Sequence, residues 1–274
     1  MAQSTTKLST LAYDRKGAGE PVVLIHGIGH RRQAWDPVFD RLAERYDVIR
    51  LDLAGFGESP RYPDGAPYTM DNACADLTAN FAEWGVERPH VVGNSLGGAI
   101  ALELAVRGLV SSATVLSPAG FFGRVARLWP MVMLSLLRLV GMLPDRVLLA
   151  VSRSRVGRYL GGFLLYTNPH RTTAESTYGD ALAMKRATAF FPTIRAGLSY
   201  ELDATGLDVS TTVAWGTHDR ILNYRQATAA RRRLPTAHHV PLPDCGHVPM
   251  LDDPSLIIDV IEQTVARARA SKAA

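Results

Sequence analysis

The chain contains little cysteine: among 274 residues there are only Cys74 and Cys245. A fold held together by several disulfides is therefore excluded, and the count is typical of a protein from a reducing compartment. The charge is nearly balanced, with 30 basic and 26 acidic residues. Neither Arg31-Arg32 nor Arg231-Arg232-Arg233 is interleaved with the aromatic residues of a nucleic-acid groove, so we expect no nucleic-acid partner.

Long apolar segments are also missing. The most apolar stretch, Met131 to Leu143, is interrupted by Arg138 and Gly141, and a membrane-spanning helix needs about 20 apolar residues. The first residues show no apolar core of a secretory signal peptide. We therefore expect no integral membrane segment and a cytoplasmic location.

Motifs for bound groups are absent as well. We find no zinc-ligand spacing, no phosphate-binding loop and no dinucleotide fingerprint after the first strand pattern. The sequence thus predicts neither a metal nor a cofactor. Apolar residues make up 47% and charged residues 20%, which is ordinary for a globular protein.

What the sequence does contain is a repeated alternation of short apolar runs and helical patterns. Apolar runs of this length, bounded by turn residues, are typical of strands buried on both faces of a parallel sheet. Helices between them indicate right-handed crossovers in an α/β fold. An antiparallel edge strand is predicted at Lys7–Tyr13. The parallel strands are predicted at Pro21–His26, Tyr46–Asp52, His90–Asn94, Ala113–Ser117, Thr211–Trp215 and Ala237–Pro241.

This rhythm stops between residues 120 and 207, where the sequence becomes helical and rich in Leu and Arg. We interpret residues 1–119 and 208–274 as two parts of one α/β core. Residues 120–207 are predicted to form a helical cap over the sheet edge where ligands bind. The alternative is that these helices simply extend the core.

The strongest chemical signal is Gly93-Asn94-Ser95-Leu96-Gly97-Gly98, which follows a strand pattern and opens a helix pattern. In this context G-x-S-x-G is a nucleophile elbow, a sharp turn that exposes the serine hydroxyl above the sheet. Glycines on either side avoid side-chain clashes across the turn. Ser95 is therefore the candidate nucleophile.

Serine needs a general base, and the base needs an acid to orient it. His247 lies in a loop directly after the last strand pattern, and Asp219 follows the strand pattern before it. The order Ser, Asp, His along the chain is the one that an elbow of this kind requires. We therefore predict a triad of Ser95, His247 and Asp219.

The segment His26-Gly27-Ile28-Gly29 follows the first long parallel strand. Its glycines allow the backbone to turn its amides inward. We predict that the N–H groups of Ile28 and Leu96 form an oxyanion hole, in which one donor lowers a reaction barrier by about 3 kcal/mol.

These four motifs, together with Asp52-Leu53-Ala54-Gly55-Phe56-Gly57-Glu58-Ser59, resemble the α/β-hydrolase superfamily over most of the chain outside the insertion. The resemblance implies a mostly parallel sheet of eight strands, helices on both faces and a cap. Haloalkane dehalogenases and epoxide hydrolases of this superfamily carry a carboxylate at the elbow. Ser95 makes those activities unexpected.

Three functions stay open. The first is a serine hydrolase that cleaves a carboxylic ester of a small to medium lipophilic substrate through an acyl-enzyme. Gly-Asn-Ser also resembles carbon–carbon bond hydrolases acting on aromatic ring-cleavage products, but these typically place tryptophan after the histidine, where this chain has Val248. The third is a ligand sensor of low turnover.

The expected partner is a small-molecule ester or a related lipophilic substrate, and the sequence gives no signal for an oligomeric state. Such a substrate favours an apolar pocket with a few polar groups. The predicted pocket residues are His30, Trp35, Asn94, Phe121, Trp129, Met133 and Val248.

Overall fold

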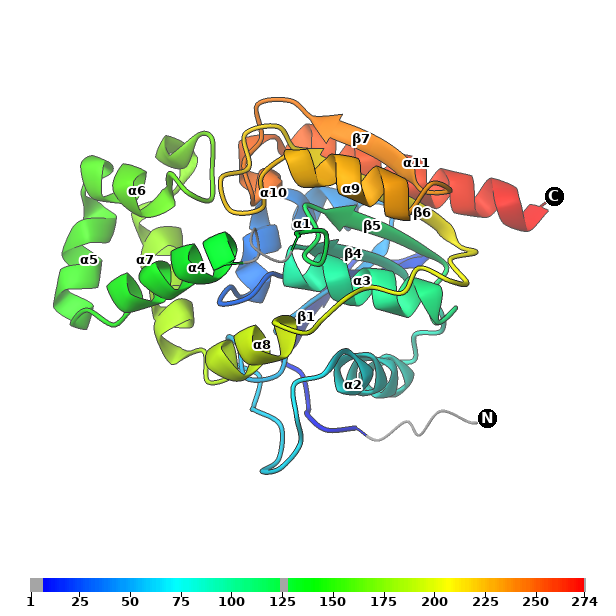
Figure 1. The fold of residues 1–274 in the computed structure, drawn as a ribbon, viewed down its shortest axis with the longest axis horizontal. Coiled ribbons are helices and arrows are strands. Elements are labelled where there is room, and N and C mark those ends of the chain that lie inside the picture. Colours follow the sequence, from blue (N-terminus) through cyan, green and yellow to red (C-terminus); the bar gives the residue numbers. More distant parts are fainter. Residues whose placement is uncertain (1–6, 124–127, 274) are drawn as a thin grey trace.

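The computed structural model describes residues 7–123 and 128–273, and these form one sheet of seven strands (Figure 1). The order across the sheet is β1-β3-β2-β4-β5-β6-β7; β1 is antiparallel to β3 and every other pair is parallel. The α/β fold class predicted from the sequence is confirmed, although the described residues contain seven strands rather than eight. The strands are β1 (Tyr13–Lys16), β2 (Pro21–Ile25), β3 (Asp47–Leu51), β4 (His90–Asn94), β5 (Ser112–Leu116), β6 (Ser210–Gly216) and β7 (His238–Leu242).

The antiparallel edge strand begins later than the sequence predicts. Tyr13–Lys16 pairs with β3, whereas residues 7–12 form no strand. The amides of Leu8 and Ser9 donate instead to the carboxylate of Asp76, both at 2.8 Å. The Leu11 amide donates to the side chain of Asn80 at 3.2 Å. Side chains of a distant helix therefore satisfy the backbone that the prediction assigned to a strand.

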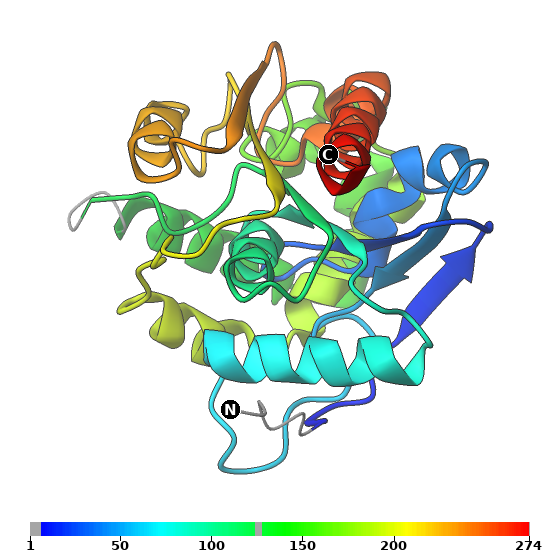
Figure 2. The same cartoon turned by 90° about the vertical axis from the view of Figure 1, so that its right-hand side faces the viewer.

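Side chains alternate between the two faces of the sheet, as on β2, where Val23 and Ile25 enter one core cluster and Val22 and Leu24 the other. Alternation of this kind follows from the period of two in a strand. Helices cover both faces (Figure 2). The first cluster receives α2 (Met70–Glu83), α3 (Leu96–Val106) and α9 (Arg225–Arg233). The second receives η1 (Arg32–Trp35), α1 (Asp36–Leu42), α10 (Pro249–Asp252) and α11 (Pro254–Ala273).

The segment between β5 and β6 is helical, and α4 to α7 gather at one end of the molecule (Figure 1). The last helix, α8, begins with the fully buried Phe190, and the amide of Ala189 donates to Gly55 O at 3.2 Å. This segment is thus anchored on the core at α8. Its division from the core at residues 120 and 207 stays a prediction. The elements are α4 (Leu128–Gly141), α5 (Asp145–Arg153), α6 (Arg155–Gly162), η2 (Pro169–Arg171), α7 (Ala174–Arg186) and α8 (Phe190–Gly197).

We predict that Asp76→Ala lowers the free energy of unfolding by about 2–3 kcal/mol, because the buried amides of Leu8 and Ser9 lose their acceptor. Urea denaturation measures this change. Asp71→Ala on the same helix is the matched control, since Asp71 is exposed and, within the described part of the chain, forms an ion pair with Arg107 alone. Its cost should stay below about 1 kcal/mol. Equal costs for the two variants would contradict this account of the N-terminal segment.

Candidate active site

Ser95 stands at a sharp turn between β4 and α3, with φ +56° and ψ −113°. A positive φ is rare for a residue with a side chain and is strained, at about 1–3 kcal/mol. The turn has no room for side chains beside it: a Cβ on Gly93 would lie 2.1 Å from Gly97 O, and one on Gly97 would lie 2.2 Å from Ile25 O. The amide of Ser95 donates to Leu116 O at 3.0 Å. The turn is thus tied to the end of β5.

His247 and Asp219 meet beside this turn. His247 Nδ1 lies 2.8 Å from Asp219 Oδ2, and both residues are 3% exposed. Asp219 Oδ1 accepts the amides of Ile221 at 2.9 Å and Leu222 at 2.7 Å. A carboxylate with these partners is an acceptor only, so Nδ1 of His247 carries the proton and Nε2 presents a lone pair.

Asn94 links the histidine loop to the elbow. Its Nδ2 group donates to His247 O at 2.8 Å and to Leu116 O at 3.1 Å. Asn94 directly precedes Ser95, so one buried amide fixes three loops at the carboxyl edge of the sheet. The sequence predicted Asn94 as a pocket residue; the structure places its side chain among main-chain carbonyls instead.

The first glycine turn lies against the elbow. A Cβ on Gly27 would come within 3.1 Å of Ser95 Cβ. Among the described residues, the backbone amides of Ile28 and Leu96 donate to no protein acceptor. Unpaired N–H groups beside a nucleophile are the arrangement that stabilises an oxyanion. Their role in an oxyanion hole stays a prediction.

Comparison with known proteins agrees with this geometry. A sequence model described as the alpha/beta hydrolase family matches residues 22–260. The chain belongs to the alpha/beta hydrolase family. The resemblance seen in the sequence is thereby confirmed.

Two relatives and one solved structure show how far the likeness extends. An uncharacterized protein of Mycobacterium tuberculosis is 30% identical, over 92% of this chain and 77% of that protein. A pimeloyl-[acyl-carrier protein] methyl ester esterase of Aeromonas hydrophila is 26% identical, over 93% of this chain and 99% of its own. The structure of a thermophilic esterase from Thermogutta terrifontis superposes with a TM-score of 0.71 at 23% identity, covering 95% of this chain and 94% of that chain.

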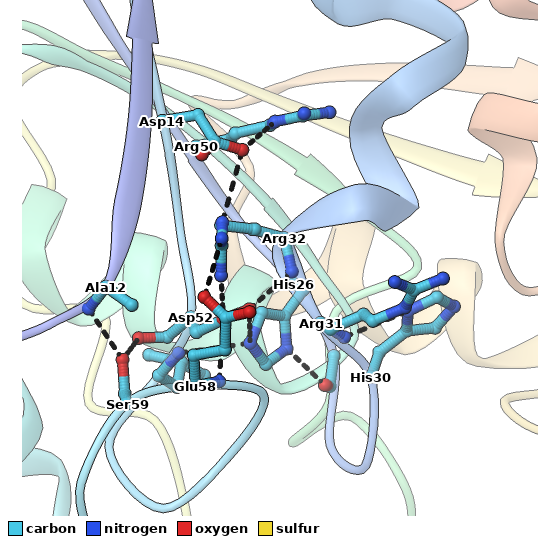
Figure 3. A network of polar contacts seen from close by, with 12 residues as sticks. Ala12, Asp14, His26, His30, Arg31, Arg32, Arg50, Asp52, Glu58 and Ser59 are labelled. Atoms are coloured by element: carbon cyan, nitrogen blue, oxygen red, sulfur yellow. Dashed lines mark hydrogen bonds and ion pairs between the residues drawn. The ribbon is translucent and has the colours of Figure 1, made fainter. Parts of the chain in front are cut away.

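A buried ionic network supports the glycine turn of this α/β hydrolase (Figure 3). Asp52, which is fully buried, accepts the Arg32 amide at 2.6 Å and the Arg32 guanidinium at 2.5 Å. The same carboxylate accepts the amide of Glu58 at 3.0 Å. Arg32 reaches on to Asp14 at 3.1 Å. The network therefore joins the loops that follow β2 and β3.

His26 connects this network to the glycine turn. Its Nε2 accepts the Leu53 amide at 3.0 Å, so Nδ1 is the protonated nitrogen and donates to Gly27 O at 2.7 Å. Burial lowers the pKa of His26 to about 4, because desolvation outweighs the attraction of Asp52 for the charged form. The neutral imidazole thus holds the carbonyl of the residue before Ile28.

Asp252 attaches residues 167 and 168 to the histidine loop. Its carboxylate accepts the amides of Thr167 and Asn168, with nearest distances of 3.0 and 2.8 Å, and that of Gly246 at 2.8 Å. Sequence reasoning missed Asp252 and the pair of Asp52 and Arg32. Two features of the sequence could have indicated them. Arg32 and Asp52 are opposite charges that follow neighbouring strands, and Asp252 lies five residues after His247.

Several predicted pocket residues lie elsewhere. Trp35 is fully buried in the second core cluster, and Val248 also packs there. Phe121 is 3% exposed and packs its edge against Trp215, with ring centroids 6.2 Å apart. Trp129 is 52% exposed on α4. These four therefore belong to the core or to the outer surface rather than to a pocket.

The remaining predicted pocket residues, His30 and Met133, are half-buried. His30 Nδ1 accepts the Arg31 amide at 3.1 Å, while its buried Nε2 has no hydrogen-bond partner among the described residues. Met133 packs against the first core cluster. Their contact with a substrate stays a prediction.

A cavity of about 340 Å³ has Leu96, the residue after the elbow, in its wall, whereas neither Ser95 nor His247 lines it. It follows one face of α3 through Ile100 and Glu103 to Arg107, whose guanidinium pairs with Asp71 at 2.7 Å. The opposite wall is formed by α8 and the residues after it, including Tyr200. One part of the wall is apolar and consists of Leu53, Ala54, Phe56, Leu96 and Ile100.

We predict that the free energy of unfolding falls as the pH is lowered from about 6.5 towards about 4, partly through His26. Because the folded pKa of His26 is below its usual value, the unfolded chain binds the extra proton in this window. One such group contributes up to about 1.4 kcal/mol per pH unit. Chemical denaturation across this pH range should give a flatter profile for His26→Asn.

The matched control is His218→Asn, because the His218 side chain is 51% exposed. This variant should keep the wild-type slope. The His26→Asn variant should keep part of the dependence of unfolding free energy on pH, because other groups also titrate in this range. One of them is His90, since burial lowers its pKa as well. If both variants flattened the profile equally, the role of His26 would be wrong.

Proposed function

We propose that this α/β hydrolase is a serine hydrolase that cleaves a carboxylic ester of a small to medium lipophilic substrate through an acyl-enzyme. The observation that carries the proposal is the buried 2.8 Å hydrogen bond between His247 and Asp219 beside the strained turn of Ser95. The relative from Aeromonas hydrophila is named as an esterase and is similar along nearly the whole chain, which supports the same reaction class.

In the proposed first half-reaction, Ser95 Oγ attacks the ester carbonyl and its proton passes to His247 Nε2. The carbonyl oxygen becomes an oxyanion, held by the N–H groups of Ile28 and Leu96. Asp219 stabilises the imidazolium that forms. The tetrahedral intermediate collapses, the alcohol leaves with the proton from His247, and the acyl group remains on Ser95.

In the second half-reaction, His247 takes a proton from water, which attacks the acyl carbonyl. The tetrahedral intermediate expels Ser95 Oγ, which regains its proton from His247, and the carboxylic acid is released. The chain itself supplies every proton transfer in this sequence.

The cavity beside the elbow supports a lipophilic substrate. Its volume is within the range of small-molecule sites, and its wall includes the apolar side chain of Leu96, which directly follows Ser95 in the chain. We infer that an apolar substrate group occupies the part of the cavity lined by Leu96 and Ile100. Residues 120–207 are proposed as the cap that closes over it, since α8 forms part of the cavity wall.

The proposal predicts that Ser95→Ala lowers kcat on p-nitrophenyl esters by at least about 10³-fold, because the attacking oxygen is removed. A fluorophosphonate should label the unmodified chain with one equivalent at Ser95, read by intact and peptide mass spectrometry. Ser111→Ala is the matched control, because Ser111 is half-buried directly before β5, where its hydroxyl donates to Arg88 O and accepts from Lys272 Nζ. It should retain both activity and labelling.

Three results would contradict the proposal. Undiminished turnover in Ser95→Ala would show that Ser95 is not the nucleophile. Faster cleavage of a vinylogous diketone acid than of any ester would replace ester hydrolysis by carbon–carbon bond hydrolysis. Tight ligand binding with negligible turnover over a broad panel would indicate a sensor.

A further inference from the structure

The exposed apolar side chains of the molecule are concentrated in one short segment. Of seventeen exposed large hydrophobic residues among those described, fourteen lie between positions 128 and 163. Single exposed apolar residues are normal, but a dense group indicates an interaction surface. We name this group the outer cap face: Leu128, Trp129, Val132, Leu136, Leu139, Val140, Met142, Leu143, Val147, Val151, Val156, Tyr159, Leu160 and Phe163.

The exposed residues follow helical spacing, so whole helix faces are apolar towards solvent. On α4 they include Val132, Leu136 and Leu139, at steps of four and three. On α6 and its C-cap they are Val156, Tyr159, Leu160 and Phe163, at steps of three, one and three. A surface helix normally turns such a face to the core. On α4 and α6, by contrast, apolar side chains also lie on the face that is turned to solvent and away from the rest of the protein.

The start of α4 and the end of α6 meet at Arg220. The indole of Trp129, at the start of α4, donates to Arg220 O at 2.9 Å. The guanidinium of the same Arg220 donates to Phe163 O, at the end of α6. In Figure 1, α4, α5 and α6 stand together at the end of the molecule away from β7 and the C-terminus. The helices that carry the outer cap face therefore lie at one end of the molecule.

The charges on this surface are nearly all positive. Residues 128–163 contain five arginines and a single acidic residue, Asp145, which is already paired with Lys185 at 2.7 Å. Arg146, Arg153 and Arg155 are exposed and pair with no acidic side chain in the described part of the chain. An occupant of this face must therefore be apolar and carry negative charge.

A second copy of the chain fits poorly. A two-fold dimer through the outer cap face would set the same patch against itself, so arginines would meet arginines with no free acidic partner. An anionic lipid surface offers acyl chains for the apolar residues and headgroups for the guanidinium groups. Trp129 and Tyr159 are residue types enriched at such interfaces.

We propose that the outer cap face binds the surface of an anionic lipid membrane, with α4 and α6 lying in the headgroup region. No helix among the described residues has the length and hydrophobicity to cross a bilayer, so the contact is made from one side. The proposal rests on surface chemistry and is independent of the proposed hydrolysis.

Vesicle co-sedimentation tests the proposal, using the full chain with Ser95→Ala so that no lipid is consumed. We expect binding to phosphatidylcholine vesicles containing phosphatidylglycerol, weaker binding to pure phosphatidylcholine, and loss of binding as salt is raised. The combination of Arg146→Glu, Arg153→Glu and Arg155→Glu should weaken binding at least about tenfold.

A second variant tests the apolar part of the surface. Leu136→Glu with Leu160→Glu places two carboxylates on exposed helix faces and should also weaken binding at least about tenfold, since apolar burial is lost and anionic headgroups are repelled. Circular dichroism and thermal unfolding, unchanged from the parent, show that the variants fold.

The matched charge control lies on α9, outside the outer cap face. Arg225→Glu, Arg231→Glu and Arg232→Glu alter the net charge by the same amount at exposed positions, and binding should change by less than about threefold. Absent binding, equal binding to neutral vesicles, or equal loss in the control would overturn the proposal. Sedimentation velocity showing a dimer that the outer-cap variants abolish, without vesicle binding, would assign the face to a second copy.

Discussion

The hydrogen bond between His247 Nδ1 and Asp219 Oδ2 is the interaction on which the candidate site depends. It joins two loops that follow neighbouring strands, and its length is 2.8 Å in a place where both side chains are almost fully buried. In such surroundings a carboxylate without partners would be costly. Two backbone amides on Asp219 Oδ1 remove that cost and keep the residue an acceptor. The tautomer of His247, with its proton on Nδ1, follows from this arrangement.

Other buried polar groups hold the surrounding loops in the same manner. Asp52 joins the loops after β2 and β3, and Asp252 joins the histidine loop to residues 167 and 168. Each of these carboxylates accepts at least two backbone amides. Removal of either carboxylate would leave several buried N–H donors without an acceptor. Such a substitution is therefore expected to lower the free energy of unfolding. The site thus combines a sheet edge, which brings the loops together, with side chains that fix each loop.

Much of this was predictable because short motifs have a local physical cause. The glycines at 93 and 97 are required by close backbone contacts, so the elbow is visible in the sequence alone. The parallel strands are apolar because helices cover both faces, and their predicted bounds agree with the structure to within about two residues. The structure also brings the sequence-derived pair His247 and Asp219 into hydrogen-bond contact.

What could not be predicted depends on partners distant in the sequence. The edge strand was placed too early because Asp76 and Asn80 bind the backbone that precedes it. Trp35 was assigned to a pocket although it fills the core, since one short helical turn does not show which side faces inward. Trp129 was predicted as a pocket residue, yet the structure leaves 52% of it exposed on α4.

The central claim is that Asp219 fixes His247 with its proton on Nδ1. Histidine side-chain NMR on ¹⁵N-labelled protein at neutral pH measures this directly, with His247→Gln to assign the signals. The account predicts a protonated Nδ1 and an unprotonated Nε2 for His247, and a shift of the proton to Nε2 in Asp219→Asn. A proton on Nε2 in the unaltered protein, or a tautomer unaffected by Asp219→Asn, would contradict it.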